Sequence, residues 1–486
     1  MPLPDRQAAI PLLEALQTAA HATRAAFHTP GHKKGQGIPA PLANFWGAAV
    51  FRADLPELPE LDNLFAPVSV IQAAQNLAAE AFGADRSWFL ANGSTCGIEA
   101  AVLATCNPGD KLILPRNVHQ SAVAALILSG AIPIWVEPEY DATWNLVHGV
   151  SLTSLEIAIA QHPDAKAVLI VSPTYYGVCS NVEAIAQLTH QYGMPLLVDE
   201  AHGAHFAFHP HLPTPALQSG ADLVVQSTHK TLSALTQAAM LHIKGDRVDG
   251  DRLTRCLQLV QSTSPSYLLL ASLDAARQQM ATQGKALWTE TLKLAAIAHT
   301  QLSQISGLVV LPVSSSSGFH ALDPTRITVD VSGLGLTGFA ADEILHQTLN
   351  VTCELPGLQH LTFILTPGNT PEDIDRLIQS FKILAVTARP FASFPPHLPH
   401  LPIPSHTPLS PRQAFFSPTH TVPLSEAIAH FSAELICPYP PGIPVLFPGE
   451  VITVEAIEYL QHVLATGGIL TGCADSQLQT LRIVKE

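Results

Sequence analysis

Short apolar runs alternate with longer segments of helical period between residues 73 and 225. A strand buried on both faces leaves a nearly continuous apolar run, whereas a helix that covers a sheet shows one apolar face. Strands and helices that alternate in this way form an α/β layer with a parallel sheet. We therefore predict an α/β fold with a mainly parallel sheet, whose strands lie at residues 111–114, 132–136, 167–171, 195–198 and 223–225.

The pattern changes further along the chain. A break at 264–266 precedes a long helical pattern, and a strand-like run begins at Arg326, which together predict a smaller α+β domain. A stretch dense in proline and histidine then favours an extended connector. The predicted organisation is an N-terminal segment (1–40), a large domain (41–265), a small α+β domain (266–388), a Pro/His-rich linker (389–423) and a C-terminal domain (424–486).

Composition and charge narrow the classes of ligand. The chain has 486 residues, 47% of them hydrophobic, and its 24 basic and 39 acidic residues give a formal net charge of -15. This charge argues against a nucleic-acid partner and mildly favours a cationic ligand. The apolar fraction favours much surface buried within the fold or between subunits. We expect a small-molecule ligand and an oligomer.

The sequence gives no sign of export, of a membrane span or of a metal site. The first 24 residues lack the cationic start and unbroken apolar stretch of a secretory signal. Residues 121–136 are interrupted by Gly130 and Pro133 and are too short to span a bilayer, so they predict a core helix that runs into a buried strand. Seven cysteines without a CxxC pair fit reduced thiols. We expect a cytoplasmic protein without a metal.

Two charged residues stand at the ends of predicted strands. Lys230 follows the apolar run at 223–225, and Asp199 ends the run at 195–198. A lone loop lysine is usually solvated, but a carboxylate at the end of a buried strand needs a cationic partner. A protonated pyridine nitrogen is such a partner, and it keeps the ring electron-withdrawing.

A glycine-flanked turn, ANGSTCG at 91–97, opens a helix that we predict from Ile98 onward. Ser94, Thr95 and the backbone N–H groups there can bind a phosphate at the positive end of the helix dipole, although a plain N-cap is the commoner role of such residues. His119, at the start of the next helix, can stack on a planar ring. These features occur in order on successive βα units, and the combination is more specific than its members.

Five segments carry a resemblance to a known family: FHTPGHKKG (27–35), DLPELPELDNL (54–64), ANGSTCG (91–97), DEAHGAH (199–205) and STHK (227–230). On these the chain resembles the ornithine/lysine/arginine decarboxylases, which are fold-type I pyridoxal-phosphate enzymes with the aspartate-aminotransferase-like architecture. The resemblance spans about residues 20–370, fades in the linker and returns at PYPPGIP (438–444) and at 449–450. It implies a lyase that needs pyridoxal 5'-phosphate.

The resemblance also implies roles for individual residues. Lys230 would carry the cofactor as a Schiff base, Asp199 would pair the pyridine nitrogen, and His119 would stack on the ring. His202 would lie beside the ring, and His202 or Lys230 would reprotonate Cα. Residues implied around the phosphate and in the remaining pocket are Gly93, Ser94, Thr95, Ser227, His229, Ser172 and Thr174.

The implied reaction converts a basic L-amino acid (lysine, arginine or ornithine) to a diamine or agmatine and CO2, a step of polyamine biosynthesis. The family's sites lie at a two-fold interface, which implies a homodimer or a dimer-based oligomer. The wing domain of larger relatives is absent here, so we do not expect decamers. Candidate acids for the distal cation, supplied within or across subunits, are Asp54, Glu57, Glu60, Asp62 and Glu354.

Other functional classes agree with the sequence motifs to different degrees. An aminotransferase or an aldolase-type lyase on the same fold stays open, although no carboxylate-binding arginine can be singled out among Arg326, Arg376 and Arg389. The complete cofactor set disfavours a catalytically inactive regulatory homologue. The DEAH string at 199–202 matches a helicase box, but no phosphate loop accompanies it. The histidines near it, including His205, lack the spacing of a helical metal site.

Overall fold

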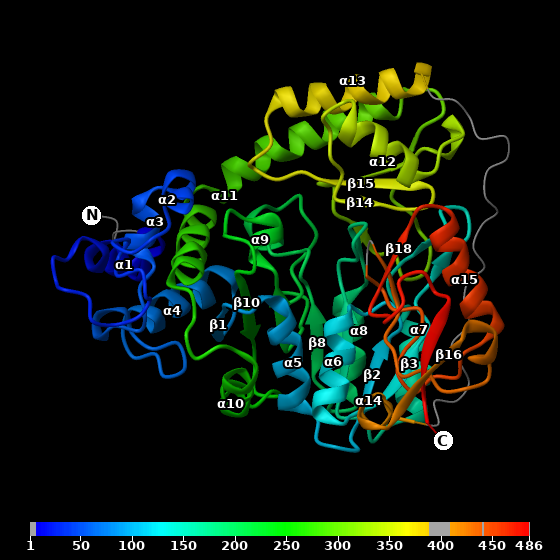
Figure 1. Cartoon of the computed structure of the whole chain (residues 1–486), viewed down its shortest axis with the longest axis horizontal. Coiled ribbons are helices and arrows are strands. Elements are labelled where there is room, and N and C mark those ends of the chain that lie inside the picture. The colour runs from blue at the N-terminus through cyan, green and yellow to red at the C-terminus, as the bar shows by residue number, and fades with distance from the viewer. Residues whose placement is uncertain (1–5, 388–408, 440–441, 486) are drawn as a thin grey trace. The chain divides into compact units, whose positions relative to one another are not determined.

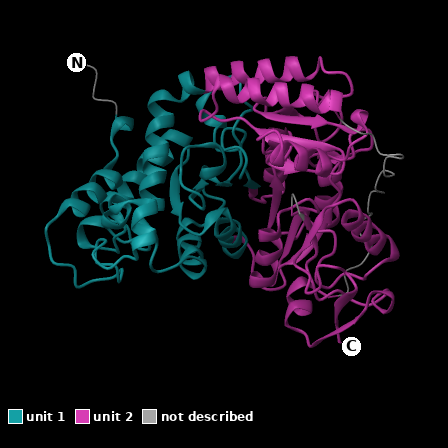
Figure 2. Cartoon of the chain, turned by 45° about the horizontal axis from the view of Figure 1, so that its top comes forward, with its two compact units in different colours: residues 1–104, 198–287 teal, residues 105–197, 288–486 magenta. Residues whose placement is uncertain are grey.

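The computed structural model describes residues 6–387, 409–439 and 442–485, and the chain divides into two compact units (Figure 2). Unit 1 comprises Met1–Ala104 and Val198–Leu287, and unit 2 comprises Thr105–Leu197 and Trp288–Glu486. The chain passes from one unit to the other at the last residue of α5 (Gly93–Thr105), then within strand β8 (Leu196–Asp199), and again within the long helix α11 (Tyr267–Leu302). Each unit is described by itself.

Unit 1 holds a short run of strands with helices around it (Figure 1). Strand β10 (Ala239–Ile243) lies between β1 (Arg86–Leu90) and β9 (Leu223–Gln226) and runs antiparallel to both. Helix α5 (Gly93–Thr105) follows β1, and α9 (Thr228–Thr231) follows β9. The other elements of this unit are η1 (Arg6–Ala8), α1 (Pro11–His21), α2 (Ala40–Trp46), α3 (Ala48–Ala53), η2 (Pro59–Leu61), α4 (Val70–Phe82), η3 (Phe206–Phe208) and α10 (Gly250–Val260).

Unit 2 contains a parallel group of strands. Strand β2 (Lys111–Pro115) lies between β3 (Ile132–Val136) and β6 (Ala167–Val171) and is parallel to both. All five residues of β6 are buried, as its apolar sequence requires. The helices that accompany these strands are α6 (Gln120–Ser129), α7 (Leu152–Gln161) and α8 (Val182–Gln191), and the short strands are β4 (Tyr140–Asp141), β5 (Leu146–Val147) and β7 (Val178–Cys179).

The strands and the helix–strand transition predicted from apolar runs are confirmed. Residues 121–136 form α6 followed by β3, and Gly130 ends the helix with a left-handed φ of 74°. A Cβ on Gly130 would lie 3.2 Å from Cδ of Arg412 and 3.3 Å from Cβ of Pro108, so both the backbone angle and the space favour glycine. Helices α7 and α8 are capped by the preceding residues Ser151 and Asn181, whose side chains accept backbone N–H groups.

Residues 309–364 contain an antiparallel sheet with a hydrophobic core of its own, inside the range predicted as a small α+β domain. The strand order is β11-β13-β15-β14, and the predicted strand at Arg326 is β13. Ile327, Val329 and Phe381 are among its buried residues. The elements are β11 (Val309–Val310), β12 (Ala321–Leu322), β13 (Arg326–Asp330), η4 (Ser332–Leu334), α12 (Gly338–Gln347), β14 (Leu355–Pro356), β15 (His360–Ile364) and α13 (Pro371–Thr387).

The C-terminal residues form a further group with a separate core, which includes Ile436, Leu460 and Leu481. Strand β16 pairs with β19, and β17 pairs with β18, both antiparallel. The elements are α14 (Pro411–Phe416), β16 (Thr419–Pro423), η5 (Leu424–Glu426), β17 (Cys437–Tyr439), α15 (Val454–Ala465), β18 (Ile469–Thr471) and β19 (Thr480–Val484).

The predicted linker 389–423 needs a correction. Its first part, to residue 408, lies outside the described residues, but the rest forms α14 and β16 and is not an extended connector. Ser410 and Gln413 make a reciprocal capping box, and Pro411 occupies the first turn, where a missing N–H costs nothing. Proline therefore starts a helix here instead of excluding one.

The structure bears on two further predictions, which concern the cysteines and membrane-spanning helices. All seven cysteines lie in described segments, and each is a free thiol. Among the helices that the structure describes, none is long and apolar enough to cross a membrane.

Candidate active site

Asp199 ends strand β8, and its side chain is buried, with 7% of the residue exposed. Its Oδ1 accepts the N–H of Ala201 at 3.1 Å. Burial raises the pKa of the Asp199 carboxyl, while the positive charge of Lys230 and the Ala201 N–H partly offset that rise. An ionised carboxylate in this position therefore calls for a further cationic partner.

Lys230 lies on the short helix α9, directly after strand β9. Its backbone N–H donates to the carbonyl oxygen of Ser227 at 3.0 Å, and its Nζ lies 3.0 Å from Nε2 of His202. His202 is buried. In such a contact between two nitrogens one must donate and the other accept, so the pair can hold a proton and pass it between amine and imidazole.

The Ser-Thr turn lies within the first turn of α5, because this helix begins at Gly93 and not at Ile98 as predicted. Gly93 has a left-handed φ of 74°, and the hydroxyl of Ser227 donates to Ser94 Oγ at 2.7 Å. Thr95 is exposed. Hydroxyls from α5 and from the end of β9 are thus brought together where the helix dipole is positive, which suits a phosphate.

Gly97 allows α5 to pack closely on the strands of unit 1. A Cβ at this position would lie 2.7 Å from Cγ1 of Val225 and 2.8 Å from Cδ1 of Leu90. Both distances are too short for carbon atoms, so the helix start depends on the absence of a side chain here.

His229 lies between Thr228 and Lys230 on α9. Its Nδ1 is 2.9 Å from the carbonyl oxygen of Ala238. Since a carbonyl can only accept, Nδ1 carries the proton in this contact.

Three further predicted residues belong to unit 2 and make local hydrogen bonds. His119 caps α6 and accepts the Ser121 N–H on Nδ1 at 3.2 Å. Ser172 Oγ accepts the N–H of Ser180 at 3.2 Å, and Thr174 Oγ1 accepts the N–H of Val178 at 3.2 Å. Their predicted roles at the cofactor stay predictions.

Most acids predicted to meet the distal cation already have partners in unit 1. The interactions join Asp54 to His32 Nε2 at 3.1 Å, Glu57 to Asn63 Nδ2 at 2.8 Å and Glu60 to Arg24 Nη1 at 2.7 Å. Glu354 belongs to unit 2, where its backbone N–H pairs with Thr362. The assignment of these acids to substrate stays a prediction.

Asp62 has a structural role at the start of α4. Its carboxylate accepts the N–H groups of Ser69 at 2.7 Å and Ile71 at 3.2 Å. Burial alone would raise the pKa of the Asp62 carboxyl, but backbone N–H groups, those of Ser69 and Val68 foremost, hold it below its usual value. Binding a substrate through Asp62 would require these bonds to be given up.

A buried chain of polar side chains lies behind the site and was missed from the sequence. Glu200 Oε2 accepts from Gln226 Nε2 at 2.7 Å, and Glu200 Oε1 accepts the Ala216 N–H at 2.8 Å. Gln226 Oε1 is 3.2 Å from His242 Nε2, and His242 Nδ1 is 2.7 Å from Ser87 Oγ. The polar Gln226 and His242 within apolar strands were the available signal.

The groups gathered in unit 1 fit pyridoxal phosphate. A phosphate suits the start of α5 with its Ser94–Ser227 hydroxyl pair, a pyridinium would neutralise the buried Asp199, and Lys230 offers a primary amine. Over residues 6–387, 409–439 and 442–485, no three His, Cys, Asp or Glu side chains are grouped to hold a metal ion.

Comparison with known proteins identifies the family. The model of the Orn/Lys/Arg decarboxylase major domain matches residues 10–328, and that of the C-terminal domain of the same family matches residues 399–474. The arginine decarboxylase of Bacillus subtilis is 41% identical over 98% of both chains, and that of Bacillus anthracis is 39% identical over 98% of this chain and 97% of its own.

Solved structures agree with this match. The lysine decarboxylase of Francisella novicida superposes with a TM-score of 0.82 at 25% identity, over 99% of this chain and 82% of that one. The constitutive lysine decarboxylase of Escherichia coli has the same TM-score at 22% identity, over 98% and 82% of the two chains, and so supports the fold. The predicted fold-type I architecture is confirmed. The chain belongs to the Orn/Lys/Arg decarboxylase family and is a decarboxylase of a basic amino acid.

Proposed function

We propose that this protein decarboxylates L-arginine to agmatine and CO2 with pyridoxal 5'-phosphate as its cofactor. The observation that carries the reaction is the grouping of Lys230, His202 and buried Asp199 in the same unit as the α5 turn. The choice of arginine rests on the two arginine decarboxylases that match nearly the whole chain at about 40% identity.

The cofactor's parts have assigned partners. Lys230 would hold it covalently, Asp199 would pair the ring nitrogen, and the turn at Gly93, Ser94 and Thr95 would bind the phosphate. When bound, pyridoxal phosphate supplies an electron sink for the charge left on Cα as CO2 departs. Ser227 and His229 would contribute to the same pocket in unit 1. The family resemblance assigns the ring-stacking role to His119 and pocket roles to Ser172 and Thr174.

The chain's own residues would supply the proton that the reaction consumes. Arginine loses CO2 and Cα gains one proton, so each turnover consumes a proton. Lys230 Nζ and His202 Nε2, 3.0 Å apart, form a pair that can deliver it, because either nitrogen can be the donor. Asp199, held by the Ala201 N–H, keeps negative charge at the ring nitrogen.

The test is a substrate panel. Purified protein with added cofactor is assayed for CO2 release from arginine, lysine and ornithine, with the amine product identified. Borohydride should then trap the cofactor on Lys230, and Lys230→Ala should be inactive while still folded, because a half-buried polar side chain contributes little packing. Release from lysine or ornithine in preference to arginine, transamination in place of CO2 release, or cofactor trapped on another lysine would overturn the assignment.

We further propose that the active unit is at least a dimer and that the acidic segment 54–64 reaches the neighbouring subunit's site. Unit 1 exposes large apolar side chains near this segment in sequence, among them Phe27 (95%), Phe45 (82%) and Trp46 (53%). Such residues are typical of surfaces that another chain covers. Acids on a segment remote in sequence from the cofactor residues would complete each site across a two-fold axis.

Complementation tests the shared site. Mixing inactive Lys230→Ala with an inactive Glu60→Ala protein should restore activity, because one site of the heterodimer then holds both wild-type contributions. Lys230→Ala mixed with a Lys230→Arg protein is the matched control and should stay inactive. Exchange of subunits without restored activity, or a fully active monomer, would contradict the shared-site proposal.

A further inference from the structure

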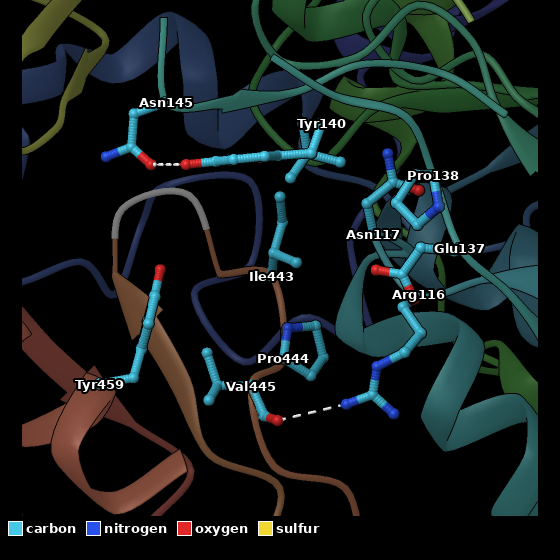
Figure 3. Close-up of a pocket in the computed structure, with 11 residues that line it drawn as sticks. Arg116, Asn117, Glu137, Pro138, Tyr140, Asn145, Ile443, Pro444, Val445 and Tyr459 are labelled. Carbon is cyan, nitrogen blue, oxygen red and sulfur yellow. Dashed lines mark hydrogen bonds between the residues drawn. The ribbon is translucent and has the colours of Figure 1, made fainter. Parts of the chain in front are cut away.

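A cavity of about 150 Å³ lies in unit 2, and the charged residues that line it already have partners. Figure 3 shows the Arg116 guanidinium directed to the carbonyl oxygen of Val445, at 3.3 Å, and the same guanidinium forms an ion pair with buried Glu450. Glu137, the second charged residue of the lining, is also engaged. Because breaking a buried ion pair is strongly unfavourable, the charges of this lining are committed to the fold.

The buried polar chain of unit 1 lies across strands that lead into the proposed site. Glu200 directly follows β8, Gln226 ends β9, His242 lies on β10 and Ser87 lies on β1. Hydrogen bonds of 2.7, 3.2 and 2.7 Å link them in this order, and each residue is at most 3% exposed. Because buried polar groups without partners are costly, these bonds hold the four segments in one arrangement.

Glu200 connects the two strand ends that carry the reacting groups. Its backbone N–H donates to the carbonyl oxygen of Val225 at 2.9 Å, and its side chain accepts from Gln226 Nε2 at 2.7 Å. Asp199 immediately precedes Glu200, and Ser227 immediately follows Gln226. The spacing between Asp199 and the segment that begins at Ser227 therefore depends on the bond between the two buried side chains.

The direction of the hydrogen bonds in this chain is linked to the charge of Glu200. With Gln226 Nε2 directed to Glu200, Oε1 of the same amide faces Nε2 of His242 and accepts its proton. Burial lowers the pKa of His242 to about 3, so the neutral ring holds one proton and its Nδ1 accepts from the Ser87 hydroxyl. Every bond then donates toward Glu200, which suits an ionised carboxylate.

A protonated Glu200 requires the opposite direction, and burial raises its pKa to about 8. One carboxyl oxygen accepts the Ala216 N–H at 2.8 Å, so the other donates the acid proton to Gln226 Oε1, after a half-turn of the amide. Gln226 then donates to His242 Nε2, and His242 Nδ1 donates to Ser87. Either direction keeps Glu200 bonded to Gln226, so the connection between the strand ends holds in both protonation states.

The described groups that act on the Glu200 carboxyl are uncharged. They are the Gln226 amide and the Ala216 N–H, and His242 behind Gln226 is neutral. Asp199, the preceding residue, is the titratable group nearest in sequence. The proton on Glu200 therefore depends on its burial and on these two donors.

We propose that Glu200 is a positioning residue for the decarboxylation, which acts through Gln226 to hold the Ser227–Lys230 segment at its distance from Asp199. This role rests on the proposed function, which assigns Asp199 and Lys230 to the cofactor. Glu200 itself touches neither cofactor nor substrate in that assignment. Its effect comes through the backbone, and misplacing a reacting group by about 1 Å can cost about a hundredfold in rate.

Three variants test the positioning role by steady-state kinetics. Glu200→Ala removes the acceptor for Gln226 and should lower kcat by about tenfold to a hundredfold, because the segment after β9 is no longer held. Glu200→Gln should stay within about threefold of the wild type, because its amide can accept the Ala216 N–H and donate to Gln226 as the protonated acid does.

Glu434→Ala is the matched control. Glu434 is also a buried acceptor of two backbone N–H groups, those of Ala474 at 2.6 Å and Arg482 at 2.9 Å, and it belongs to the C-terminal group of unit 2. The proposed function assigns no residue to that group, so this variant should lose stability but keep the wild-type kcat.

Two measurements on the cofactor-free protein separate positioning from a general loss of stability. Crystal structures should show the spacing of Asp199 and Ser227 changed by about 1 Å in Glu200→Ala and unchanged in Glu200→Gln. Nitrogen-15 spectra of the His242 ring, assigned by the signals that His242→Gln lacks, should place the proton on Nδ1 at pH 6 and on Nε2 well above pH 8. In Glu200→Gln the proton should stay on Nδ1 throughout.

An unimpaired Glu200→Ala enzyme, an equal loss of kcat in Glu434→Ala, or an unchanged spacing in Glu200→Ala would overturn the positioning role. A His242 proton that responds neither to pH nor to Glu200→Gln would overturn the coupling through Gln226, even if Glu200→Ala does not fold. If the wild type decarboxylates none of arginine, lysine and ornithine, the proposed function fails, and the crystal and nitrogen-15 measurements still decide whether Glu200 sets the spacing.

Discussion

Replacing Glu200 by glutamine should change how the stability of the protein depends on pH. Glu200 is fully buried and accepts hydrogen bonds from Gln226 and from the Ala216 N–H. Burial raises its pKa from 4.5 to about 8, even though these two donors lower it. The neighbouring His242 is kept neutral, because burial lowers its pKa to about 3. The whole chain of polar groups is therefore uncharged at neutral pH.

The sign of this pH dependence follows from comparing the folded and unfolded states of the protein. Between pH 4.5 and pH 8 the unfolded protein has lost the Glu200 proton while the folded protein keeps it. The contribution of Glu200 to folding stability is fully present below pH 4.5 and is lost as the pH rises through about 8. At about 1.4 kcal/mol for each unit between the two pKa values, the wild type should lose on the order of 5 kcal/mol relative to Glu200→Gln over this interval.

Infrared difference spectra test this directly, without assuming two-state unfolding. The wild-type minus Glu200→Gln spectrum should contain the carbonyl band of a protonated carboxylic acid at pH 6, and the band should disappear with a midpoint near 8. Glu156→Gln, at an exposed position, is the control and should give no such band at pH 6. Denaturant unfolding across the same pH range should show the stability difference. A band absent at pH 6, with parallel stability profiles, would mean that the two donors keep Glu200 ionised and would refute the reasoning.

Three further substitutions probe the site and its supports. Asp199→Asn should lower kcat by about three orders of magnitude while cofactor binding stays measurable by absorbance, because a neutral amide no longer favours a charged ring nitrogen; an unimpaired variant would refute the pairing. Gly97→Ala should lower stability by about 1–3 kcal/mol, as its Cβ would lie 2.7 Å from Cγ1 of Val225; an unchanged melting temperature would mean that α5 can shift freely. Glu450→Gln should cost about 3–5 kcal/mol in denaturant unfolding, because it leaves the Arg116 guanidinium without its counter-charge; an unchanged midpoint would mean that the pair is not stabilising.

The sequence predicted the parallel strands well because burial on both faces leaves little choice of residue. In β6 and β9 every residue is buried, and both appear in the sequence as unbroken apolar runs that end at a polar residue. That ending is informative, since the polar residues after buried strands are those that can face a ligand. Asp199 and Lys230 were selected by this rule, and the positive charge of Lys230 acts to lower the pKa of the Asp199 carboxyl.

Other features of the structure depend on pairing between residues that are distant in sequence, so they leave no local pattern in the sequence. The contact of Gln226 with His242 requires the antiparallel register of β9 and β10, which sets Met240 opposite Gln226. The ion pair between Arg116 and Glu450 joins positions 334 residues apart. The start of α5 at Gly93 was also missed, because a glycine with positive φ is a common helix end and gives no sign of a helix beginning.

Neighbouring residues at the ends of strands β8 and β9 have different roles in unit 1. Asp199 and the segment from Ser227 to Lys230 continue the strands toward the site, whereas Glu200 and Gln226, their direct neighbours in sequence, are tied into the buried polar chain. Because successive residues at a strand end face opposite ways, one register fixes both sets at once. A substitution on the site side should therefore remove activity and spare stability, and one on the buried side should shift stability first and move the reacting groups only through the shared backbone. Lys230→Ala and Glu200→Gln are the pair that separates these effects, since Glu200 directly follows β8, Lys230 lies on α9 after β9, and only Lys230 has a role in the proposed chemistry.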